Sequence, residues 1–500
     1  MHPLLHLMRR MLATGTMIFL PTFGFFLATH WSTIASPWLG LDDYYVIVTN
    51  TEDVIRLFIG QGRPFYMPFI LLQKGAFALF PSLEHASVFL HLIQAAIHTL
   101  TAVFVGLFLV RGTGRPLSFL AVIPFLFWPI NEVAFWISTI GYTFAGLFSV
   151  IGVYLIYGKM AQGWRWLGVL LIVAAALTSQ TACLTGLSMY IIALLLGWSQ
   201  DDRTAGTRSF IWIMAAYVVG GAASALLAYF LSYRLTEVIF FSWGSAITIF
   251  SKSIRLLLIP DVFPIWLRQV QMIAFFLGPA AVIIHILIRL RSAISLLRGA
   301  AIALIMVLLL IIPLIPVYAI GGAGLPPRVL YAEPLSLTAA LSLLLVFTSH
   351  RMFSAGVFLT LILALTIGYI PISAVSASEH VRTFQGDRQR LRMLEKEAQH
   401  RALTTVVIAN MPERSTTPNP YHHQYYLGDS KKSAFAVWWS SDYFVRALST
   451  SLQTTRDPPA MQHCTDYCRV AGFDSANVQD PRRLTAIFLP SKEQLLCYCP

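Results

Sequence analysis

Two adjacent acids, Asp42 and Asp43, are the residues whose types and spacing most directly suggest chemistry. They belong to the stretch Leu41 to Pro64, LDDYYVIVTNTEDVIRLFIGQGRP, which places four acids just beyond the first apolar run. Neighbouring carboxylates repel each other, and such pairs raise the pKa of one acid, hold a cation or act as a base toward a substrate. The structural alternative is a solvated loop in which Asp43 caps a helix through Tyr44 and Tyr45.

A second candidate is the turn GGAGLPPRVLYAEP, from Gly321 to Pro334. Its glycines free backbone amides and its prolines forbid helix, so that Arg328 lies where a helix restarts, with Tyr331 on the same face. Amides and a guanidinium together suit a phosphate group. A flexible turn with one snorkelling arginine is the structural alternative.

Four of the five cysteines lie in the C-terminal tail. Residues one or two positions apart seldom bridge each other, so cross-pairing of Cys464 and Cys468 with Cys497 and Cys499 is the arrangement favoured in an oxidising compartment. A zinc site of the form C-x3-C and C-x-C is the rival, although its spacing is atypical. Cys183 lies in an apolar run and is expected to be a packing residue.

Composition indicates what must position these groups. The chain has 57% hydrophobic residues and a mean hydropathy of +0.68, whereas soluble domains have about 45–50% apolar residues. The fold class predicted is therefore an all-α polytopic membrane protein. The net charge of +12 comes from basic residues beside apolar runs, which indicates topology and not nucleic-acid binding.

Apolar runs near the spanning length predict about eleven transmembrane helices, beginning with an uncleaved helix over Met11 to Ala28. With the N-terminus inside, the basic turns fall inside, and the acidic loop and everything after about Ser376 fall outside. The inner turns carry Arg111, Arg115, Lys159, Arg165, Arg203, Arg208, Arg289, Arg291, Arg298 and Arg351.

Several outer elements are expected near this loop. The stretch MPFILLQKGAFALFP, which ends at Pro81, is too short to cross and should lie along the interface, as should the segment 233–266. The run Leu117 to Pro129 is also short. Glu132 lies between Trp128 and Trp136, a mixture expected at an interface or a sugar-binding wall, with an aromatic belt favoured for the two tryptophans.

Polar residues on the helices have structural explanations. The hairpin LTSQTACLTG is expected to hydrogen-bond between helices, and His98 and His285 are expected to be core or interface residues.

Three parts are predicted: a membrane domain over 1–376 with an outer catalytic loop over 30–82, a charged helical stalk over 377–402, and a small α/β domain over 403–500. In the last part, TTVVIANMP is typical of a buried strand, and AFAVWWSSDYFVRAL of a strand or helix that packs on it.

This organisation resembles the GT-C superfamily of polytopic glycosyltransferases, particularly bacterial enzymes that modify lipopolysaccharide or other envelope glycans. Leu41-Asp42-Asp43-Tyr44 occupies the place of the catalytic acid after helix one, and Gly62-Arg63-Pro64 is similar to a GRP or GRW found in many members. Arg328 matches an arginine in a late outer loop. The WWDYG-type motif of the oligosaccharyltransferases is absent from the sequence.

The resemblance implies transfer of a hexose or pentose from a polyprenyl-phosphate or polyprenyl-diphosphate donor to a glycan, lipid or protein acceptor, on the periplasmic face of a bacterial inner membrane. Asp42 or Asp43 would be the base, and the two acids are also candidates for holding Mg²⁺ or Mn²⁺. The expected substrate contacts are Arg63, Tyr44, Glu132, Arg328 and Tyr331.

Two other classes remain open. A lipid-linked sugar flippase or transporter would carry charges within its spans and show internal repeats, and few such charges and no repeat are found. An O-antigen polymerase or ligase usually has its large outer loop in mid-chain, whereas the outer bulk here is terminal. The sugar, the acceptor and the stereochemical outcome are not encoded in a recognisable pattern.

Overall fold

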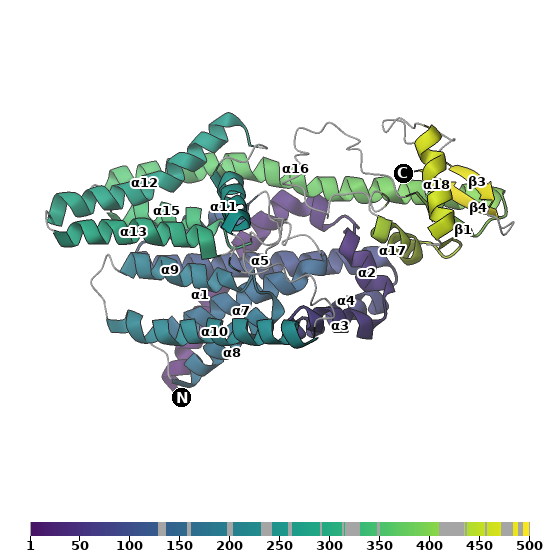
Figure 1. Cartoon of the computed structure of the whole chain (residues 1–500). Coiled ribbons are helices and arrows are strands. Elements are labelled where there is room, and N and C mark those ends of the chain that lie inside the picture. The colour runs from purple at the N-terminus through teal and green to yellow at the C-terminus, as the bar shows by residue number, and fades with distance from the viewer. Residues whose placement is uncertain are drawn as a thin grey trace.

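The structure of the 500-residue chain is a computed structural model (Figure 1). The residues that it describes are 2–128, 137–157, 162–197, 204–231, 243–258, 263–290, 293–312, 315, 331–347, 351–409, 435, 438–455, 458–471, 484–488 and 494–499.

A bundle of long helices forms the body of the molecule. Among the described residues, six segments are long and apolar enough to cross a membrane: Met17–Ile34, Leu83–Thr113, Ile137–Tyr157, Ser209–Leu231, Ile265–Ile284 and Ser354–His400. Five apolar helices of 10–17 residues accompany them: Pro116–Leu126, Gln162–Thr178, Leu184–Leu196, Gly299–Ile311 and Leu335–Val346. The protein is therefore an α-helical membrane protein, as its composition predicts.

The helices of the bundle have these bounds: α1 His2–Ile34, α5 Leu83–Thr113, η2 Pro116–Val122, α6 Ile123–Leu126, η4 Ile137–Thr139, α7 Ile140–Tyr157, α8 Gln162–Thr178, α9 Leu184–Gly197, α10 Thr204–Leu231, α12 Ile265–Leu290, α13 Ala293–Ile311, α15 Leu335–Phe347 and α16 Arg351–His400. The short run from Leu117 is a 3-10 helix followed by one α-helical turn, with Pro116 and Pro124 each near the start of one piece. Helix α11, Trp243–Leu258, crosses the direction of the bundle (Figure 1).

Close backbone approaches hold the long helices together. A Cβ added at Gly278 of α12 would lie 1.9 Å from the carbonyl oxygen of Ala340 in α15. Between α7 and α8, a Cβ at Gly152 would lie 2.7 Å from the oxygen of Gly168. Only glycine permits such contacts, which are typical of small-residue interfaces between membrane helices.

Three short helices lie between α1 and α5: α2 Leu41–Val48, α3 Thr51–Gly60 and α4 Met67–Leu79, with the 3-10 turn η1 Pro64–Tyr66 between α3 and α4. We call them the outer hairpin after the side of the membrane predicted for them, and the end of the molecule that carries them and the terminal domain is called the outer end. Helix α3 starts at an Asn50 cap, whose side chain accepts a hydrogen bond from the Glu52 amide. Gly62 then adopts φ +72°, and a Cβ there would lie 2.2 Å from the Ser224 oxygen of α10. The chain can therefore turn against α10 only with glycine at this position.

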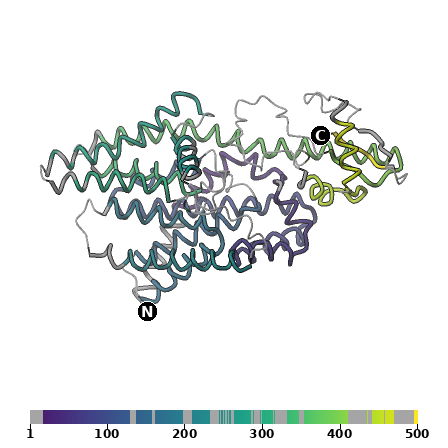
Figure 2. The backbone as a smooth tube through the Cα atoms, in the orientation of Figure 1, coloured from purple at the N-terminus to yellow at the C-terminus, as the bar shows by residue number. Residues whose placement is uncertain are grey.

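Helix α16 continues unbroken from the bundle into the terminal domain (Figures 1 and 2). The domain boundary predicted near Ser376 thus falls inside one 50-residue helix. The stalk portion is not exposed on all sides, since Val381, Phe384 and Leu391 are buried against other elements.

The terminal domain has one four-stranded sheet in the order β2-β1-β4-β3. Strand β1 is parallel to β2 and to β4, and β3 is antiparallel to β4. The bounds are β1 Thr405–Ile408, β2 Gln453–Thr454, β3 Leu484–Phe488, β4 Gln494–Tyr498, α17 Trp438–Leu448 and α18 Pro458–Ala471. The expected buried strand in TTVVIANMP is β1, and the stretch AFAVWWSSDYFVRAL contains the helix α17.

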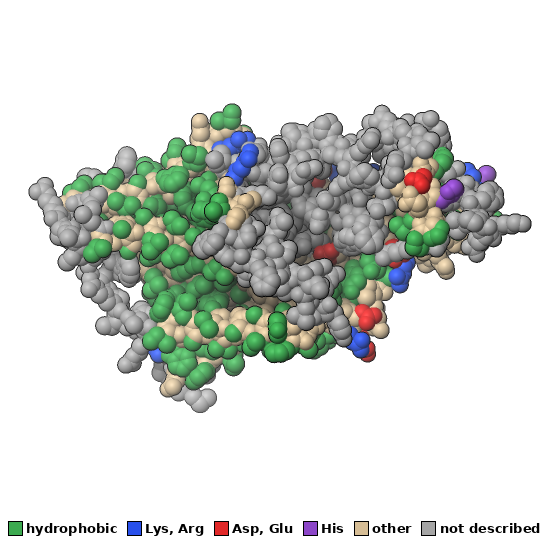
Figure 3. All heavy atoms as spheres, viewed as in Figure 1, with side chains coloured by type: hydrophobic (Ala, Val, Ile, Leu, Met, Phe, Trp, Pro, Cys, Tyr) green, Lys and Arg blue, Asp and Glu red, His purple; other side chains and the backbone are tan. Residues whose placement is uncertain are grey.

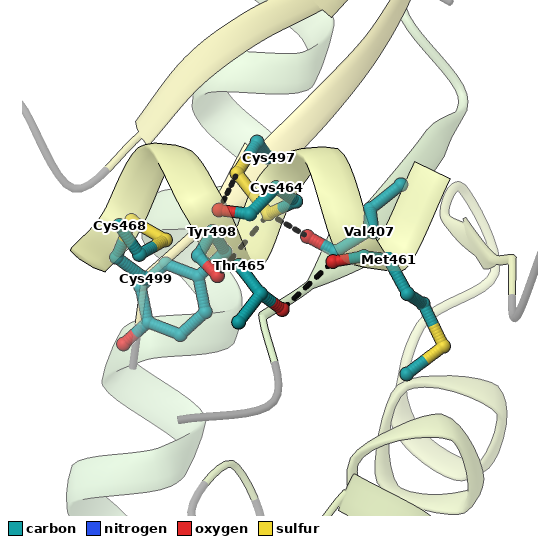
Figure 4. The surroundings of a disulfide bond; sticks show 8 residues. All are labelled: Val407, Met461, Cys464, Thr465, Cys468, Cys497, Tyr498 and Cys499. Carbon is teal, nitrogen blue, oxygen red and sulfur yellow. Dashed lines mark hydrogen bonds between the residues drawn. A yellow bond between two sulfur atoms is a disulfide. The ribbon is translucent and has the colours of Figure 1, made fainter. Parts of the chain in front are cut away.

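Two disulfides join α18 to the end of β4 (Figure 4). Cys464 is bonded to Cys497 and Cys468 to Cys499, with Cα atoms 5.6 and 5.5 Å apart. This is the cross-pairing favoured by the spacing, and sulfurs committed to disulfides are not zinc ligands. The remaining cysteine, Cys183, is buried and reduced.

The surface divides by chemistry along the length of the molecule. Among the coloured residues on the face seen in Figure 3, hydrophobic side chains predominate over the bundle, and the acidic side chains in view lie toward the half that carries α2, α3 and the terminal domain. Trp128 departs from its expected place in an aromatic belt. It is buried and packs against Phe263 and Tyr369, because the short α6 ends inside the bundle.

Candidate functional site

Asp43 is held at the base of α2 by backbone amides from two parts of the chain. Its Oδ2 accepts a hydrogen bond from the Gly40 amide at 2.7 Å, and its Oδ1 accepts one from the Ser138 amide at 2.6 Å. The first bond closes the N-terminus of α2, but from a different position than predicted, because Gly40 is the N-cap and Asp43 is the third helical residue. Asp43 is also buried and not in a solvated loop. The second bond joins α2 to η4, which lies 95 residues away.

Burial makes Asp43 an unusual acid. Only 1% of the residue is exposed, and this burial raises the pKa of its carboxyl group to about 7, although the amide hydrogen bonds from Gly40 and Ser138 lower it. The charge of Asp42 adds to the increase. An acid with a pKa near neutrality can take up or release a proton under ordinary conditions.

Asp42 is half-buried, so it is the member of the pair that a molecule outside the fold can reach more readily. The residues present do not make a convincing cation site. Each oxygen of Asp43 already accepts an amide hydrogen bond, and the only described group of three His, Cys, Asp or Glu ligand atoms close together consists of Cys464, Cys468 and Cys497. No chemical step is therefore assigned to a metal.

The turn η4 is the point where the outer hairpin meets the bundle. The Ile137 oxygen accepts a hydrogen bond from Gln73 of α4 at 3.1 Å, and the Ser138 oxygen accepts one from the Tyr66 hydroxyl. Thr139 Oγ1 accepts a bond from Gln94 of α5 at 3.1 Å. All three residues of η4 are thus bonded by side chains from other elements.

Helix α4 also fixes the far end of α2. Lys74 Nζ donates to the carbonyl oxygens of Ile47 and Thr49 at 2.9 and 2.6 Å, which are among the groups that the end of α2 leaves without helical partners. Through these contacts, α4 supports the C-terminal end of the acidic helix α2. Its outward-facing residues include exposed Met67, Leu71 and Leu79, which suits contact with a lipid interface.

Trp38 anchors the loop that enters α2. Its ring stacks with two histidines, His91 of α5 and His380 of α16, and each pair of ring centroids is 4.5 Å apart. Its Nε1 donates to the Thr33 oxygen at 3.1 Å. A residue from the stalk portion of α16 therefore helps to place the acidic helix.

Arg63 lies in a polar network between the outer hairpin and the bundle. Its Nε donates to Gln180 Oε1 at 2.8 Å, and its Nη1 donates to the Tyr142 hydroxyl at 3.0 Å. Gln180 Nε2 in turn donates to Ser224 Oγ at 2.7 Å. The hairpin LTSQTACLTG therefore bonds to other elements, as expected, and its partners include the arginine beside the acidic loop.

Tyr44, expected to contact substrate, instead faces the terminal domain. It is 2% exposed, its hydroxyl donates to the Leu39 oxygen at 3.2 Å, and its ring meets Phe444 edge-on with centroids 5.0 Å apart. The neighbouring Tyr45 meets Tyr443 in the same way at 5.2 Å. Helix α17 thus covers one side of α2.

Tyr331, another predicted substrate contact, is buried inside the bundle. Its hydroxyl shares a hydrogen bond with His98 Nδ1 at 3.0 Å, and its ring meets that of Phe125 at 5.3 Å. His98 Nε2 lies 3.2 Å from the Leu126 oxygen, so His98 is the core residue that was expected. Glu132 and Arg328 lie outside the described residues.

Sequence reasoning missed Trp38, Ser138 and Phe444, which all help to place the acidic pair. Trp38 could have been noticed as a lone tryptophan between Pro37 and Gly40, just before the acids. Ser138 donates to Asp43 through its backbone amide, which every non-proline residue has, so this bond leaves no signal in the sequence. No protein-family model, curated protein or solved structure matches the chain.

Proposed function

We propose that this protein is a membrane glycosyltransferase of the GT-C type, which moves a sugar from a polyprenyl-phosphate or polyprenyl-diphosphate donor to an envelope glycan, lipid or protein. The observation that carries the proposal is the acidic pair at the outer end of the first candidate span, where buried Asp43 lies beside half-buried Asp42. A pair of this kind at a membrane surface fits a reaction that needs a base and a lipid-linked substrate.

The two acids have different roles in this proposal. Asp42 accepts the proton of the acceptor hydroxyl as that oxygen bonds to the anomeric carbon of the sugar. The bond between the anomeric carbon and the donor phosphate breaks, and its electrons leave on the phosphate oxygen. Asp43, bonded to Gly40 and Ser138, holds the start of α2 in place. Its carboxyl group also acts electrostatically on the neighbouring Asp42.

Arg63 is the described arginine best placed to meet the leaving phosphate. It follows the turn at Gly62, and its Nε and Nη1 are oriented by Gln180 and Tyr142. A guanidinium oriented in this way can bond two phosphate oxygens at once. Arg328, predicted for the same task, stays a candidate from its Gly-Pro turn.

The proposed topology follows from the same reading. We propose about eleven crossings of a bacterial inner membrane, for which the six long segments and the five shorter apolar helices are the candidates. The contact of α17 with α2 puts the acids and the terminal disulfides at one end of the molecule. Disulfides form in oxidising compartments, which favours the periplasm for that end.

The test is transfer from a panel of polyprenyl-phosphate and polyprenyl-diphosphate sugars by the purified full-length protein in lipid nanodiscs. Asp42→Asn should slow turnover by roughly 10²–10⁴-fold, the usual range for loss of a positioned base. Asp53→Asn is the matched control, because Asp53 is an exposed acid in the first turn of the neighbouring α3. It should leave the rate unchanged.

Normal turnover by correctly inserted Asp42→Asn and Asp43→Asn proteins would refute the proposed role of the pair. Uptake of a lipid-linked sugar across a sealed vesicle without transfer would identify a flippase instead.

A further inference from the structure

The terminal domain reaches the acidic pair through ring contacts. Phe444 of α17 packs against Tyr44, and Tyr443 packs against Tyr45, with centroids 5.0 and 5.2 Å apart. These tyrosines directly follow Asp43 in the sequence. The side of α2 that carries them is therefore closed by a helix from about 400 residues later in the chain.

Helix α2 depends on such neighbours. It has only eight residues, whereas isolated helices shorter than about 12–15 residues are marginal in water. Its N-terminus is fixed by the Asp43 bonds and its C-terminus by Lys74. The ring contacts with α17 supply a third support, between these two ends.

Helix α17 is itself fixed within the terminal domain. Its end is bonded to α16, because Ser449 Oγ donates to Glu395 Oε1 at 2.6 Å. Phe444 packs against Phe435, which packs against Tyr498 of β4, at 5.1 and 5.3 Å. A continuous series of rings therefore leads from α2 to the sheet.

Both disulfides meet this series of rings at its far end. Cys497 and Cys499 flank Tyr498 and are bonded to Cys464 and Cys468 of α18 (Figure 4). The strand that ends the series is thus covalently attached to a second element. Phe444 is thus connected, through Phe435 and Tyr498, to a strand that two disulfides hold.

We propose that Phe444 and Tyr443 are positioning residues for the acidic pair, so that the terminal domain is part of the reaction site and not a separate binding module. This inference rests on the proposed function for its catalytic consequence. The mechanical part, that α17 holds α2 in place, stands on the ring contacts alone.

The first experiment uses the full-length protein with Phe444→Ala, Phe444→Leu and, as a matched control, Tyr467→Ala. Tyr467 packs in the terminal domain beside the disulfides and away from the rings that touch α2. Displacement of a catalytic group by about 1 Å lowers turnover by roughly 10²-fold. Phe444→Ala should lower kcat to that extent with little change in KM, Phe444→Leu should recover part of the loss, and Tyr467→Ala should keep its kcat.

The second experiment does not require any enzymatic activity. The Asp43 carboxyl is titrated by difference infrared spectroscopy, with Asp43→Asn as the subtracted reference. The pH of its titration reports how well water is excluded from this carboxyl group. The other ionisable groups that act on Asp43 and Tyr44 are Asp42, Tyr66 of η1, and Asp387 and Arg388 of α16, all of which stay in place. Phe444→Ala should admit water and move the titration of Asp43 to lower pH, whereas Tyr467→Ala should not.

A cross-link decides between a support and a lid. Tyr45→Cys combined with Tyr443→Cys, joined by a short thiol-specific cross-linker, locks α17 on α2. Because the two substitutions remove the Tyr45–Tyr443 ring contact, the comparison is between the same double variant before and after cross-linking. A positioning role predicts that cross-linking does not lower its turnover. Loss of turnover on locking, restored on cleavage of the linker, would overturn the proposal in favour of a lid that must open.

The outcomes also separate this inference from the proposed function. An unchanged Asp43 titration in Phe444→Ala, together with unchanged kcat, overturns the positioning role while leaving the glycosyltransferase intact. If the Asp43 titration shifts in Phe444→Ala but the wild-type protein transfers no sugar from any donor, α17 does hold α2 in place and the glycosyltransferase proposal is refuted.

Discussion

Two regions of the molecule are held together by different kinds of contact: the seams where long helices meet each other, and the outer end around Asp43. At the α12–α15 and α7–α8 seams, backbones meet at glycines, and no ionisable group takes part in these approaches. At the outer end, backbone amides meet a carboxylate, and rings meet rings. These two seams should therefore be sensitive to side-chain size, whereas the stability of the outer end should also depend on pH.

The largest effect is expected from Gly278→Val. The first side-chain carbon would lie 1.9 Å from the Ala340 oxygen. The loss of folding stability should therefore exceed the roughly 1–3 kcal/mol of ordinary overpacking. Gly221→Val is the matched control, because a Cβ at Gly221 meets nothing within 4 Å. Yield of monodisperse protein in detergent and its melting temperature measure the difference, and equal behaviour would contradict the close seam.

Loss of one disulfide should weaken the outer end without opening the bundle. Cys464→Ser combined with Cys497→Ser should destabilise the terminal domain by about 2–5 kcal/mol, as is usual for small disulfide-bonded domains. Limited proteolysis should then cut the terminal domain first. Thiol counting on the unreduced, denatured wild-type protein should find one reactive cysteine, Cys183, and five would contradict both disulfides.

The stability of the outer end should decrease as the pH rises. Burial raises the pKa of Asp43 from 3.8 to about 7, so between these values the folded protein keeps a proton that the unfolded chain releases. The stabilisation is full below pH 3.8 and is lost as the pH approaches about 7. It amounts to a few kcal/mol, at about 1.4 kcal/mol for each pKa unit.

Melting temperatures at pH 5 and pH 8 measure this effect. The wild-type protein should lose more stability over this interval than Asp43→Asn, and Asp53→Asn should behave like the wild type. A wild-type protein that becomes more stable toward pH 8 would show that the folded state favours ionised Asp43.

The smallest effect is expected at the ion pair of α3. Arg56 and Glu52 are 3.8 Å apart, with side chains 75% and 76% exposed, so Arg56→Ala should change the free energy of unfolding by less than about 0.5 kcal/mol. Arg388→Ala should have the larger effect, since Arg388 pairs with Glu84 of α5 and is about one-third exposed. Chemical denaturation of the two variants, compared at low and high salt, tests the order.

Local chemistry made much of the outer end predictable. The short run after Pro64 indicated a helix that does not cross, and the acids indicated a helix start. The cysteine spacing also pointed to the observed pairing. In each case, neighbours in the sequence supply the physical cause.

Contacts between distant elements were not predictable. Gln180 meets Arg63 from 117 positions away, and Ser138 meets Asp43 through its amide, which every non-proline residue possesses. The packing of Phe444 on Tyr44 could not be separated from packing inside the terminal domain, because an apolar face does not specify its partner. Arg328 and Glu132 stay predictions.

The length of the continuous helix α16 sets the distance between the membrane and the terminal domain. Its 50 residues span roughly 75 Å, of which a membrane occupies about 30 Å, so the height of the terminal domain above the bilayer is set by residue count. The number of residues in the helix also sets the rotation of the terminal domain about the helix axis. One residue inserted near Gly386 would swing the terminal domain by about 100° and carry α17 away from α2, while seven would nearly restore the angle but raise the domain by about 10 Å. The stalk thus admits very few lengths that keep the two halves in register.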